Sequence, residues 1–423
     1  MNYKKIGDFI QQVNLKNEDG EVKNLLGVNL DKVFMPSVAN LNGVDMTKYK
    51  IIKKGQFGCK LMSVGRDKKL PISHLTDYDK AIISSAYYVF EVKNEKELLP
   101  EYLMMWFLRS ESDRFLWFLS GGDVRGRITW DDLCTLPIRI PSIEKQQQIV
   151  DEYNTVSNRI QLNEKINTNL EATAQALYKH WFVDFEFPYV TSSGVEMPYK
   201  SSGGKMVYNE ELDKDIPVGF KIGDITNIAI IEDGDRGKNY PKDYEYNTKG
   251  YCLFLGAPNV SRTGFSFKET VFISKEKDNL LRKGKLKRND IVFTTRGSSI
   301  GKLGFYSKSI VFEHLRINSG MVIFRCNSLS TSLYLYTILK GEYFQNLIQG
   351  YLSGSAQPQL PIKDLSKMPI LIPNANIINE FGLKINFIQN NIELNNRISE
   401  KLNNFKSIIL NKMARESLKP QAV

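Results

Sequence analysis

The amino-acid sequence predicts an α+β protein with two globular mixed α/β domains separated by a pair of long antiparallel coiled-coil helices, organised as an internal pseudo-two-fold repeat. Three observations predict this fold class. Part of the chain recurs at a fixed offset, each copy ends in a long stretch with coiled-coil spacing, and strand-like segments with glycine-rich turns precede each stretch. A chain of 423 residues is also long enough for two domains with separate cores.

The internal repeat is clearest at the end of each copy. Residues 128–141 match residues 360–373 without a gap, at an offset of 232 that pairs Pro137 with Pro369. The same offset continues downstream, where it pairs Asn163 with Asn395, while Lys-Ile-Gly-Asp at residues 5–8 recurs at residues 221–224 with an offset of 216. One unit has therefore been used twice, with a similar end and a divergent middle.

Each copy is predicted to contain a strand-rich globular region followed by one long helix. Residues 86–92 and 290–295 are candidate strands, and glycine-rich turns lie at residues 121–122 and 297–301. The predicted helices begin after Pro141 and Pro373. We expect five segments, which are a first globular domain at 1–141, a first helix at 142–187, a linker and second globular domain at 188–373, a second helix at 374–415, and a tail at 416–423.

Apolar residues in both helices follow the spacing of a coiled-coil seam. They step by four, three and four residues, at Ile149, Tyr153, Val156 and Ile160 and at Phe381, Ile385, Ile388 and Ile392. The stripe then shifts phase in both helices, which predicts a stutter, through Leu162, Ile166 and Leu170 and through Leu394, Ile398 and Leu402. A helix of about 57 Å cannot bury this stripe alone, so we expect the two helices to pair antiparallel as a spacer with a globular domain at each end.

The composition excludes several classes of protein. Hydrophobic residues make up 42% and charged residues 25% of the chain, which argues against disorder, a collagen-like chain or a membrane bundle. No stretch approaches the roughly 18 apolar residues of a spanning helix and no signal peptide is evident, so we expect a cytoplasmic protein. The four cysteines and three histidines are too scattered to predict a disulfide framework or a metal site.

The net positive charge of the chain is compatible with an anionic partner such as nucleic acid. The chain carries 57 Lys and Arg against 47 Asp and Glu, a formal net charge of +10. By segment the charge is +3 in residues 1–141, −3 in 142–187, +7 in 188–373 and +3 in 374–423. The acidic first helix is therefore expected to face away from phosphate or toward a protein partner.

Motifs of common catalytic sites are absent from the sequence, so we predict no catalytic residue. Residues 297–303 are one residue short of a phosphate-binding loop and end in leucine, and neither Gly-x-Gly nor Pro-Pro occurs, which removes the usual signatures of S-adenosylmethionine and adenine-N6 methyltransferase sites. Asp79 with Glu91 and Lys93 only loosely resembles a metal-dependent nuclease and is better explained as a solvated strand face. The sequence favours binding over catalysis.

Four segments resemble the specificity subunits of type I restriction-modification systems. Residues 127–141 with the glutamines at 146–148 are similar to the entry of that family's conserved helix, and residues 176–185 are similar to its central region. Residues 289–302 and 353–360 resemble its second recognition domain. The second copy departs from the pattern by lacking the glutamine run, and Gly55-Gln56-Phe57 stands where Gly-Asp-Ile is more typical.

The resemblance implies a DNA-reading subunit with no chemistry of its own. Each target recognition domain would read one half of a bipartite double-stranded DNA target, and the helices would act as a spacer ruler and as the docking surface for two modification subunits. Those subunits bind S-adenosylmethionine and methylate adenine, and two restriction subunits complete an ATP-driven, Mg-dependent endonuclease. No cofactor is expected on this chain.

Candidate DNA contacts are basic and amide side chains beside glycine turns, because Arg and Gln can each bond a base twice whereas Lys more often neutralises phosphate. They are Arg66, Lys68, Lys69, Arg125, Arg127, Arg236, Lys238, Arg262, Arg296, Lys302, Arg316, Gln357 and Gln359. The basic run at residues 282–288 is expected to contact phosphate or to serve solubility. Asn163 and Asn395 are expected to set the register of the helices, the alternative being that both face solvent at the stutter.

Two other classes of function stay open on the sequence alone. A two-headed scaffold that binds proteins would explain the duplication with an incidental basic charge. A self-sufficient nuclease or methyltransferase would require activity from the purified chain with magnesium or S-adenosylmethionine, which the missing motifs argue against.

Overall fold

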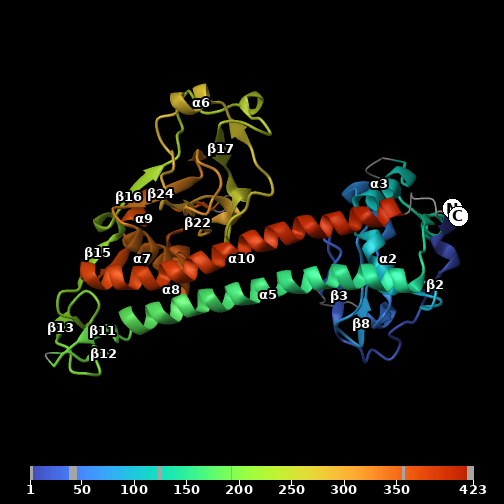
Figure 1. Cartoon of the computed structure of the whole chain (residues 1–423), viewed down its shortest axis with the longest axis horizontal. Helices are drawn as coiled ribbons and strands as arrows, with labels where there is room; N and C mark the ends of the chain where they lie inside the picture. Colours follow the sequence, from blue (N-terminus) through green and yellow to red (C-terminus); the bar gives the residue numbers. More distant parts are fainter. Residues whose placement is uncertain (1–2, 38–44, 122–125, 192, 355–357, 417–423) are drawn as a thin grey trace. The chain divides into compact units, whose positions relative to one another are not determined.

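The computed structural model describes residues 3–37, 45–121, 126–191, 193–354 and 358–416. The chain divides into two compact units (Figure 1). The first unit contains Met1–Leu162 and Ile398–Val423, and the second contains Asn163–Arg397. Each unit therefore holds one globular domain together with part of each long helix.

The two long helices begin just after the predicted prolines. Helix α5 spans Ile143–Phe182 and helix α10 spans Ala375–Glu416. Helix α5 ends before the expected boundary at residue 187, because Phe185 adopts a left-handed φ of 63° and its ring packs against Phe220 at 6.3 Å. The chain therefore leaves the helix at this point, and the ring of Phe185 is buried in the second unit.

The helices run antiparallel in each unit (Figure 1). In the first unit, Val156 near the start of α5 shares a buried cluster with Ile409 near the end of α10. In the second unit, the ring of Phe182 at the end of α5 and the ring of Phe381 near the start of α10 have their centroids 4.9 Å apart. The predicted four-three-four seam is buried or half-buried in both helices, at Ile149, Tyr153, Val156, Ile160, Phe381, Ile385, Ile388 and Ile392.

The predicted phase shift of the seam is wrong at three positions. Leu162, Ile166 and Leu394 are 51%, 42% and 45% exposed. Ile398, Leu170 and Leu402 are only partly buried. Asparagine side chains occupy the interface in this stretch, as described below, while Leu162, Ile166 and Leu394 are exposed.

The first domain, residues 4–138, contains two four-stranded sheets. One has the order β2-β9-β6-β7 and the other the order β4-β3-β8-β5. Their strands are β2 (Ile10–Val13), β9 (Tyr88–Val92), β6 (Phe57–Cys59), β7 (Ile72–His74), β4 (Phe34–Pro36), β3 (Leu25–Val28), β8 (Lys80–Ile83) and β5 (Lys50–Lys53). In the described part of this domain the α-helices are α1 (Val64–Asp67), α2 (Pro100–Phe107), α3 (Ser110–Leu119) and α4 (Trp130–Cys134), and β1 (Lys4–Lys5) pairs with β10 (Pro137–Ile138).

The second domain, residues 221–372, contains a four-stranded sheet of order β16-β24-β21-β22 and a three-stranded sheet of order β20-β17-β23. Their strands are β16 (Ala229–Asp233), β24 (Met321–Cys326), β21 (Ile291–Thr294), β22 (Leu303–Phe305), β20 (Phe272–Ile273), β17 (Cys252–Leu255) and β23 (Leu315–Ile317). Also described in this domain are the hairpin β18 (Val260–Ser261) with β19 (Gly264–Phe265), the pair β15 (Lys221–Asp224) with β25 (Pro369–Ile372), and the α-helices α6 (Lys275–Leu280), α7 (Leu329–Lys340), α8 (Glu342–Leu347) and α9 (Ile362–Ser366).

The strand orders confirm the internal repeat. In chain order, β2, β6, β7 and β9 of the first domain correspond to β16, β21, β22 and β24 of the second, and the two sheets have the same arrangement. The short pairs β1–β10 and β15–β25 are equivalent too, since they join the recurring Lys-Ile-Gly-Asp segment to the strand before each long helix. One topology has therefore been kept while the sequences between its markers diverged.

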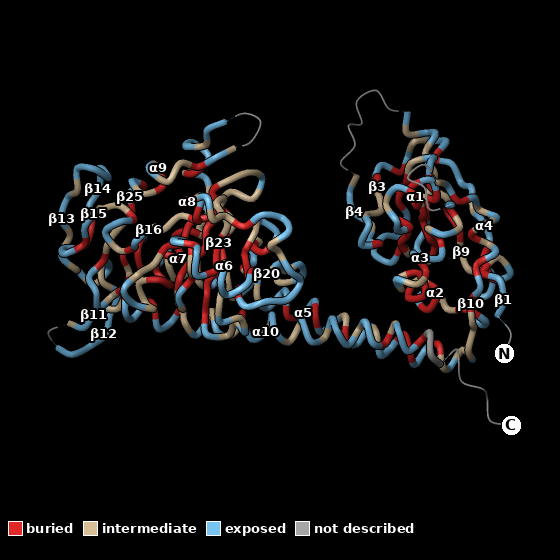
Figure 2. The backbone as a smooth tube through the Cα atoms, turned by 90° about the horizontal axis from the view of Figure 1, so that it is seen from above, coloured by how far each residue is buried: buried red, intermediate tan, exposed pale blue. Residues whose placement is uncertain are grey.

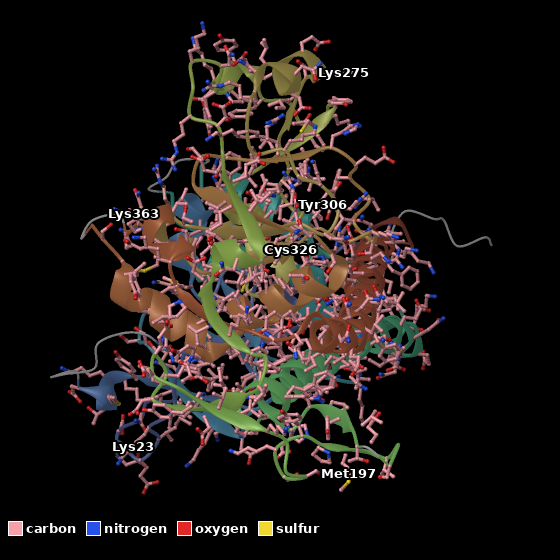
Figure 3. All side chains as sticks on the ribbon, turned by 90° about the vertical axis from the view of Figure 1, so that its left-hand side faces the viewer. Lys23, Met197, Lys275, Tyr306, Cys326 and Lys363 are labelled. Atoms are coloured by element: carbon pink, nitrogen blue, oxygen red, sulfur yellow. The ribbon has the colours of Figure 1, made fainter. Side chains whose placement is uncertain are left out.

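Two small hairpins lie between α5 and the second domain. The first pairs β11 (Pro188–Val190) with β12 (Glu196–Pro198), and the second pairs β13 (Met206–Asn209) with β14 (Lys214–Pro217). Buried residues concentrate inside each domain (Figure 2). Tyr306, which is 1% exposed, lies inside the second domain, whereas Lys275 at the start of α6 lies at its periphery (Figure 3).

None of the described helices combines the length and apolar character that a membrane span requires. Across the same residues, no group of three or more His, Cys, Asp or Glu side chains is placed to hold a metal ion.

Candidate nucleic-acid interface

Two loops occupy equivalent places in the two domains and carry most of the predicted DNA contacts. The first, which we call the connection loop, joins β6 to β7 at residues 60–71 and joins β21 to β22 at residues 295–302. The second, which we call the approach loop, leads into α4 at residues 120–129 and into α9 at residues 352–361. The offset of 232 that relates the two copies pairs Arg127 with Gln359 in this loop.

In the second domain the structure brings the two loops together. Arg296 and Gln359 form an antiparallel bridge, flanked by backbone hydrogen bonds from Gly297 to Pro358 and from Leu360 to Thr295, both 2.9 Å. Residues opposite each other in an antiparallel pair direct their side chains to the same face, with Cβ atoms about 4.5–5.5 Å apart. The side chains of Arg296 and Gln359 therefore start from the same face of this bridge.

Arg236 joins the same edge of the sheet. Its Nη2 donates to the Ser319 carbonyl at 3.2 Å, in the turn that precedes β24. The backbone of Gly234 lies so close to this turn that an added Cβ would stand 2.0 Å from the Asn318 carbonyl oxygen, so only glycine fits. Arg236, Arg296 and Gln359 thus gather where β16 and β21 end and β24 begins.

A buried carboxylate supports the Arg236 loop. Asp235 is 5% exposed and accepts hydrogen bonds from the backbone N–H groups of Arg282 and Gly237, both at 2.7 Å. These two bonds lower the pKa of Asp235 below its ordinary value of 3.8, because they favour the charged carboxylate. The loop that carries Arg236 is therefore fixed from inside the domain.

The guanidinium of Arg296 is incompletely satisfied. Among the described residues its Nε is buried without a hydrogen-bond partner. An unpaired buried donor costs about 1–3 kcal/mol, so the Arg296 side chain is held in place at an energetic cost.

The remaining candidates of the second domain make no described side-chain contact with this group. Lys238 and Arg262 are exposed, the latter on the turn between β18 and β19, and Lys302 is half-buried at the end of the connection loop. Gln357 lies outside the described residues.

The prediction that Arg316 contacts DNA is wrong. Arg316 is 5% exposed, its Nε lies 2.8 Å from Asp278 Oδ1, and its Nη2 donates to the Asp278 carbonyl at 2.9 Å. The side chain holds α6 against the three-stranded sheet instead of reaching outward. Sequence alone did not reveal the partner, which lies 38 residues away along the chain.

Two of the five basic side chains in the run at residues 282–288, Lys285 and Arg288, are used inside the protein, while Arg282, Lys283 and Lys287 are exposed. Lys285 forms an ion pair with Asp278, and the Arg288 guanidinium donates to the carbonyls of Ser307 and Ile310. Lys283 lies 3.1 Å from Asp233. For Lys285 and Arg288, neither phosphate contact nor solubility explains the charge, because Lys285 is paired with α6 and Arg288 with the segment after β22.

In the first domain the connection loop places its three candidates at the surface. Arg66 is exposed and bonded to Asp67 through Nε at 2.7 Å and Nη2 at 2.9 Å. Lys68 adopts a left-handed φ of 56°, and its Nζ lies 5.2 Å from the Trp117 ring. Lys69 is exposed. All three side chains are accessible to an anionic ligand.

A buried ion pair beneath this loop was missed by the sequence analysis. The Lys32 ammonium lies 2.9 Å from both carboxylate oxygens of Asp113, and Asp113 also accepts from the Leu70 backbone at 3.0 Å. Burial lowers the pKa of Lys32, although Asp113 opposes that shift. The pair fixes the end of the connection loop next to Lys69.

The approach loop of the first domain is described only in part. Arg127 is exposed just before α4, whose start is capped by Thr129 and Asp132 in a reciprocal capping box. Arg125 lies outside the described residues.

Asparagines line the interface between the helices in the second unit. Asn395 Nδ2 donates to Asn167 Oδ1 at 2.9 Å, and Asn167 Nδ2 donates to Asn396 Oδ1 at 2.8 Å. Asn163 is 0% exposed, so the alternative that it faces solvent is wrong. That Asn163 and Asn395 set the register stays a prediction, and the sequence did not identify Asn167 as the partner of Asn395.

Known proteins resemble this chain along most of its length. The type I restriction enzyme MjaIX specificity subunit of Methanocaldococcus jannaschii is 26% identical over 329 residues, which cover 77% of this chain and 68% of that protein. The type I restriction enzyme HindI specificity subunit of Haemophilus influenzae is 28% identical over 188 residues, 43% of this chain and 40% of that protein. The crystal structure of a type I restriction-modification system S subunit from M. genitalium has a similar fold, with a TM-score of 0.52 and 12% identity over 100% of this chain and 96% of that one.

A family model extends the comparison to both copies of the repeat. The model described as the type I restriction modification DNA specificity domain matches residues 34–172 and residues 218–412. Each matched range contains most of one globular domain and much of the long helix that follows it. With more than half of its length matched, this chain belongs to the family of the type I restriction modification DNA specificity domain.

Proposed function

We propose that this chain is the DNA sequence-specificity subunit of a type I restriction-modification complex, with each domain reading one half of a bipartite target. The observation that carries the proposal is the placement of Arg296 beside Gln359, in loops that recur at equivalent positions in the first domain. Arg can bond guanine and Gln can bond adenine with two hydrogen bonds each. Two copies of one domain with different loop residues suit two half-sites with different sequences.

The surrounding charges position the duplex without reading it. Arg66, Lys69, Lys238 and Arg262 are exposed, and Lys and Arg side chains of this kind bond phosphate oxygens regardless of sequence. The formal charges of +3 and +7 on the segments that contain the two domains favour this role, whereas the −3 on residues 142–187 disfavours DNA contact along the first helix.

The helices would serve as the spacer ruler and as the docking surface for modification subunits. Half-sites about one helical turn apart, roughly 34–36 Å, present the same face of the duplex. In this proposal the two helices, 40 and 42 residues long, would keep the two domains at that separation.

The chemistry would come from partner subunits. Two modification subunits that bind S-adenosylmethionine would methylate adenine, and two restriction subunits with ATP and Mg would cleave. This chain would hold none of these groups and would decide where the complex acts.

The test is methylation-sensitive sequencing of a host that carries this chain with its modification subunit. We expect one bipartite adenine-methylated motif with an unread spacer. A continuous motif, or no motif at all, would contradict the proposal. The second of these outcomes is the one expected of a protein-binding scaffold.

A further inference from the structure

A set of polar contacts, separate from the loops proposed to read DNA, fastens the second domain to both long helices. We call these contacts the clamp. They involve Glu171 and Gln175 of α5, Lys340 of α7, Glu393 of α10, and Ser307 and Ser309 of the segment after β22.

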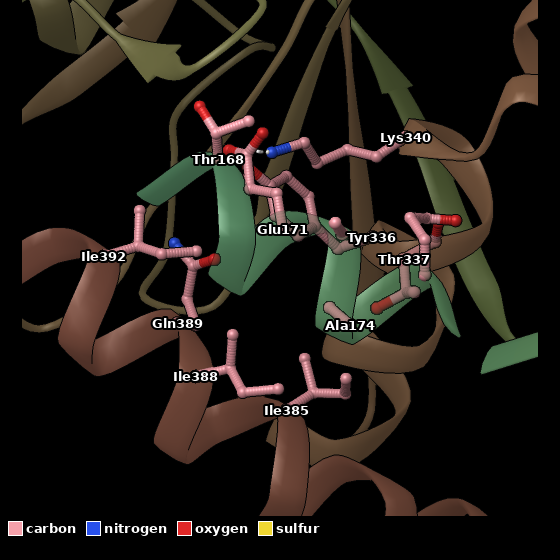
Figure 4. Close-up of a pocket in the computed structure, with 12 residues that line it drawn as sticks. Thr168, Glu171, Ala174, Tyr336, Thr337, Lys340, Ile385, Ile388, Gln389 and Ile392 are labelled. Atoms are coloured by element: carbon pink, nitrogen blue, oxygen red, sulfur yellow. Dashed lines mark hydrogen bonds and ion pairs between the residues drawn. The ribbon is translucent and has the colours of Figure 1, made fainter. Parts of the chain in front are cut away.

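The first contact joins the end of α7 to α5. The Lys340 Nζ lies 2.6 Å from Glu171 Oε1, with the two side chains 16% and 30% exposed (Figure 4). Burial alone would lower the pKa of Lys340, but the neighbouring Tyr336 and Glu171 raise it above its ordinary value, so the ammonium stays charged. Gln175, one turn further along α5, donates to the Thr337 carbonyl at 3.0 Å.

The second contact joins α10 to the segment that follows β22. Glu393 is 9% exposed and accepts from the hydroxyls of Ser307 at 2.6 Å and Ser309 at 2.5 Å. Gln389, one turn earlier, donates to the other Glu393 oxygen at 3.0 Å. Ser307 lies two residues beyond β22, whose other end is the connection loop with Lys302.

The clamp reaches the proposed reading edge through α8. Gln345 Nε2 donates to the Gly301 carbonyl at 3.0 Å in the connection loop, and to the Leu339 carbonyl at 2.7 Å at the end of α7. Lys340 follows Leu339 directly. A continuous set of contacts therefore runs from Glu171 on the helix, through α7 and α8, to the loop that carries Arg296.

Apolar packing is incomplete at this place. A cavity of about 270 Å³ lies among α5, α7 and α10, with Ile385, Ile388 and Ile392 on one side and Lys340 and Glu171 on another (Figure 4). Close packing normally fixes the relative orientation of neighbouring elements. Where a cavity interrupts it, directional hydrogen bonds and ion pairs have to supply the orientation.

We propose that the clamp fixes the angle at which the second domain stands on its helices, and thereby sets how strictly the complex selects the spacer length of its target. This inference rests on the proposed function. Successive base pairs are separated by about 3.4 Å along the duplex, so a domain free to tilt by that distance would accept targets one base pair longer or shorter. The half-site sequence, read by the loops themselves, would not change.

The experiment compares spacer selection in the assembled methyltransferase. Methylation rates are measured on duplexes with both half-sites intact and with spacers of the native length, one base pair shorter and one longer. For Lys340→Met we expect the preference for the native spacer to fall by about tenfold, in line with the coupling energies of residues in one contact network. Lys340→Arg should keep most of the preference because it restores the charge.

Matched controls separate orientation from general damage. Lys179→Met removes an exposed ion pair with Asp184, at 3.4 Å near the end of α5, and should leave spacer preference unchanged. Ser309→Ala loosens only the α10 contact and should give a smaller relaxation in a chain that still folds. Unchanged spacer preference in both Lys340→Met and Ser309→Ala overturns the inference, as does a change in the half-site letters. A wild-type complex without a bipartite motif would instead overturn the proposed function.

Discussion

The two domains share one strand topology but are fastened to the long helices in different ways. The first domain is held at the start of α5, where Gln146 is 0% exposed, accepts from the Leu99 backbone at 2.9 Å and donates to the Glu97 carbonyl at 2.8 Å. The second domain is held further along both helices, by the clamp around Glu171 and Glu393.

This difference shows which features the duplication has kept. The offset that relates the two copies places Ile378 where the first helix has Gln146, and Ile378 is buried among apolar residues of the second unit. A backbone-binding amide in one copy is therefore an apolar contact in the other. Strand order depends on patterns spread over many residues, whereas each attachment depends on a few side chains and can be replaced independently.

The largest effect is expected from exchanging the equivalent approach-loop residues, which tests whether the two domains read DNA with the same loop. Arg127→Gln and Gln359→Arg are made separately, and the methylated motif of each variant is compared with the wild type. Because a bidentate contact discriminates by about 1–3 kcal/mol, we expect roughly 10- to 100-fold less methylation of the original site. Each variant should change letters in one half-site, and the two variants should affect different halves.

Controls for this exchange use exposed charges outside the two loops. Arg114→Gln on α3 and Lys363→Gln on α9 should leave the motif unchanged. If both loop variants altered the same half-site, the view of the two domains as equivalent readers would be lost.

The next effect concerns the attachment of the first domain. Gln146→Ile copies the residue of the second helix into the first, and leaves the Leu99 N–H and the Glu97 carbonyl without their partner. We expect a loss of about 2 kcal/mol in the free energy of unfolding of the first unit, because unsatisfied buried groups cost about 1–3 kcal/mol. Denaturant unfolding measures it, with the exposed Gln147→Ala as control, and equal stability of the two variants would show that the amide contacts are dispensable.

A smaller effect is expected at the helix interface of the second unit. Asn167→Ala removes the hydrogen bonds to Asn395 and Asn396, each of which contributes about 0.5–1.5 kcal/mol. We expect a lower melting temperature than for Asn169→Ala, an exposed neighbour on α5. No difference between the two variants would indicate that the asparagines do not hold the helices in register.

The helices, the repeat and the seam were predictable because each rests on a local pattern. Ile149 and Val156, or Phe381 and Ile388, identify a helical seam by spacing alone. The phase shift of the seam at Leu162 was predicted wrongly, because this side chain is exposed. A coiled-coil interface tolerates asparagine, and the pattern of apolar residues does not show where asparagine replaces an apolar residue.

The contacts that determine which basic residues are free were beyond sequence reasoning. Arg316 is paired with Asp278 38 residues away, Lys32 with Asp113 81 residues away, and Lys340 with Glu171 169 residues away. Such pairs depend on the tertiary fold and leave no periodic trace. The sequence could therefore predict the loops that form the candidate interface, at Arg296 and Gln359, but could not separate Arg316 from them.

The smallest effect is a pH dependence that distinguishes the reading edge of the second domain from the rest of the chain. Hydrogen bonds from the backbones of Arg282 and Gly237 hold the pKa of Asp235 below 3.8 in the folded state. An acid whose pKa is lower when folded stabilises the fold above its unfolded pKa, and that contribution disappears as pH falls through the folded pKa. The free energy of unfolding of the second unit should therefore fall below pH 3.8. In Asp235→Asn this free energy should fall less over the same pH range, and it should be lower than in the wild type at neutral pH. Urea unfolding between about pH 3 and 6 measures how the free energy of unfolding of each protein depends on pH. The same pH dependence in both proteins would show that Asp235 does not anchor the Arg236 loop through its charge.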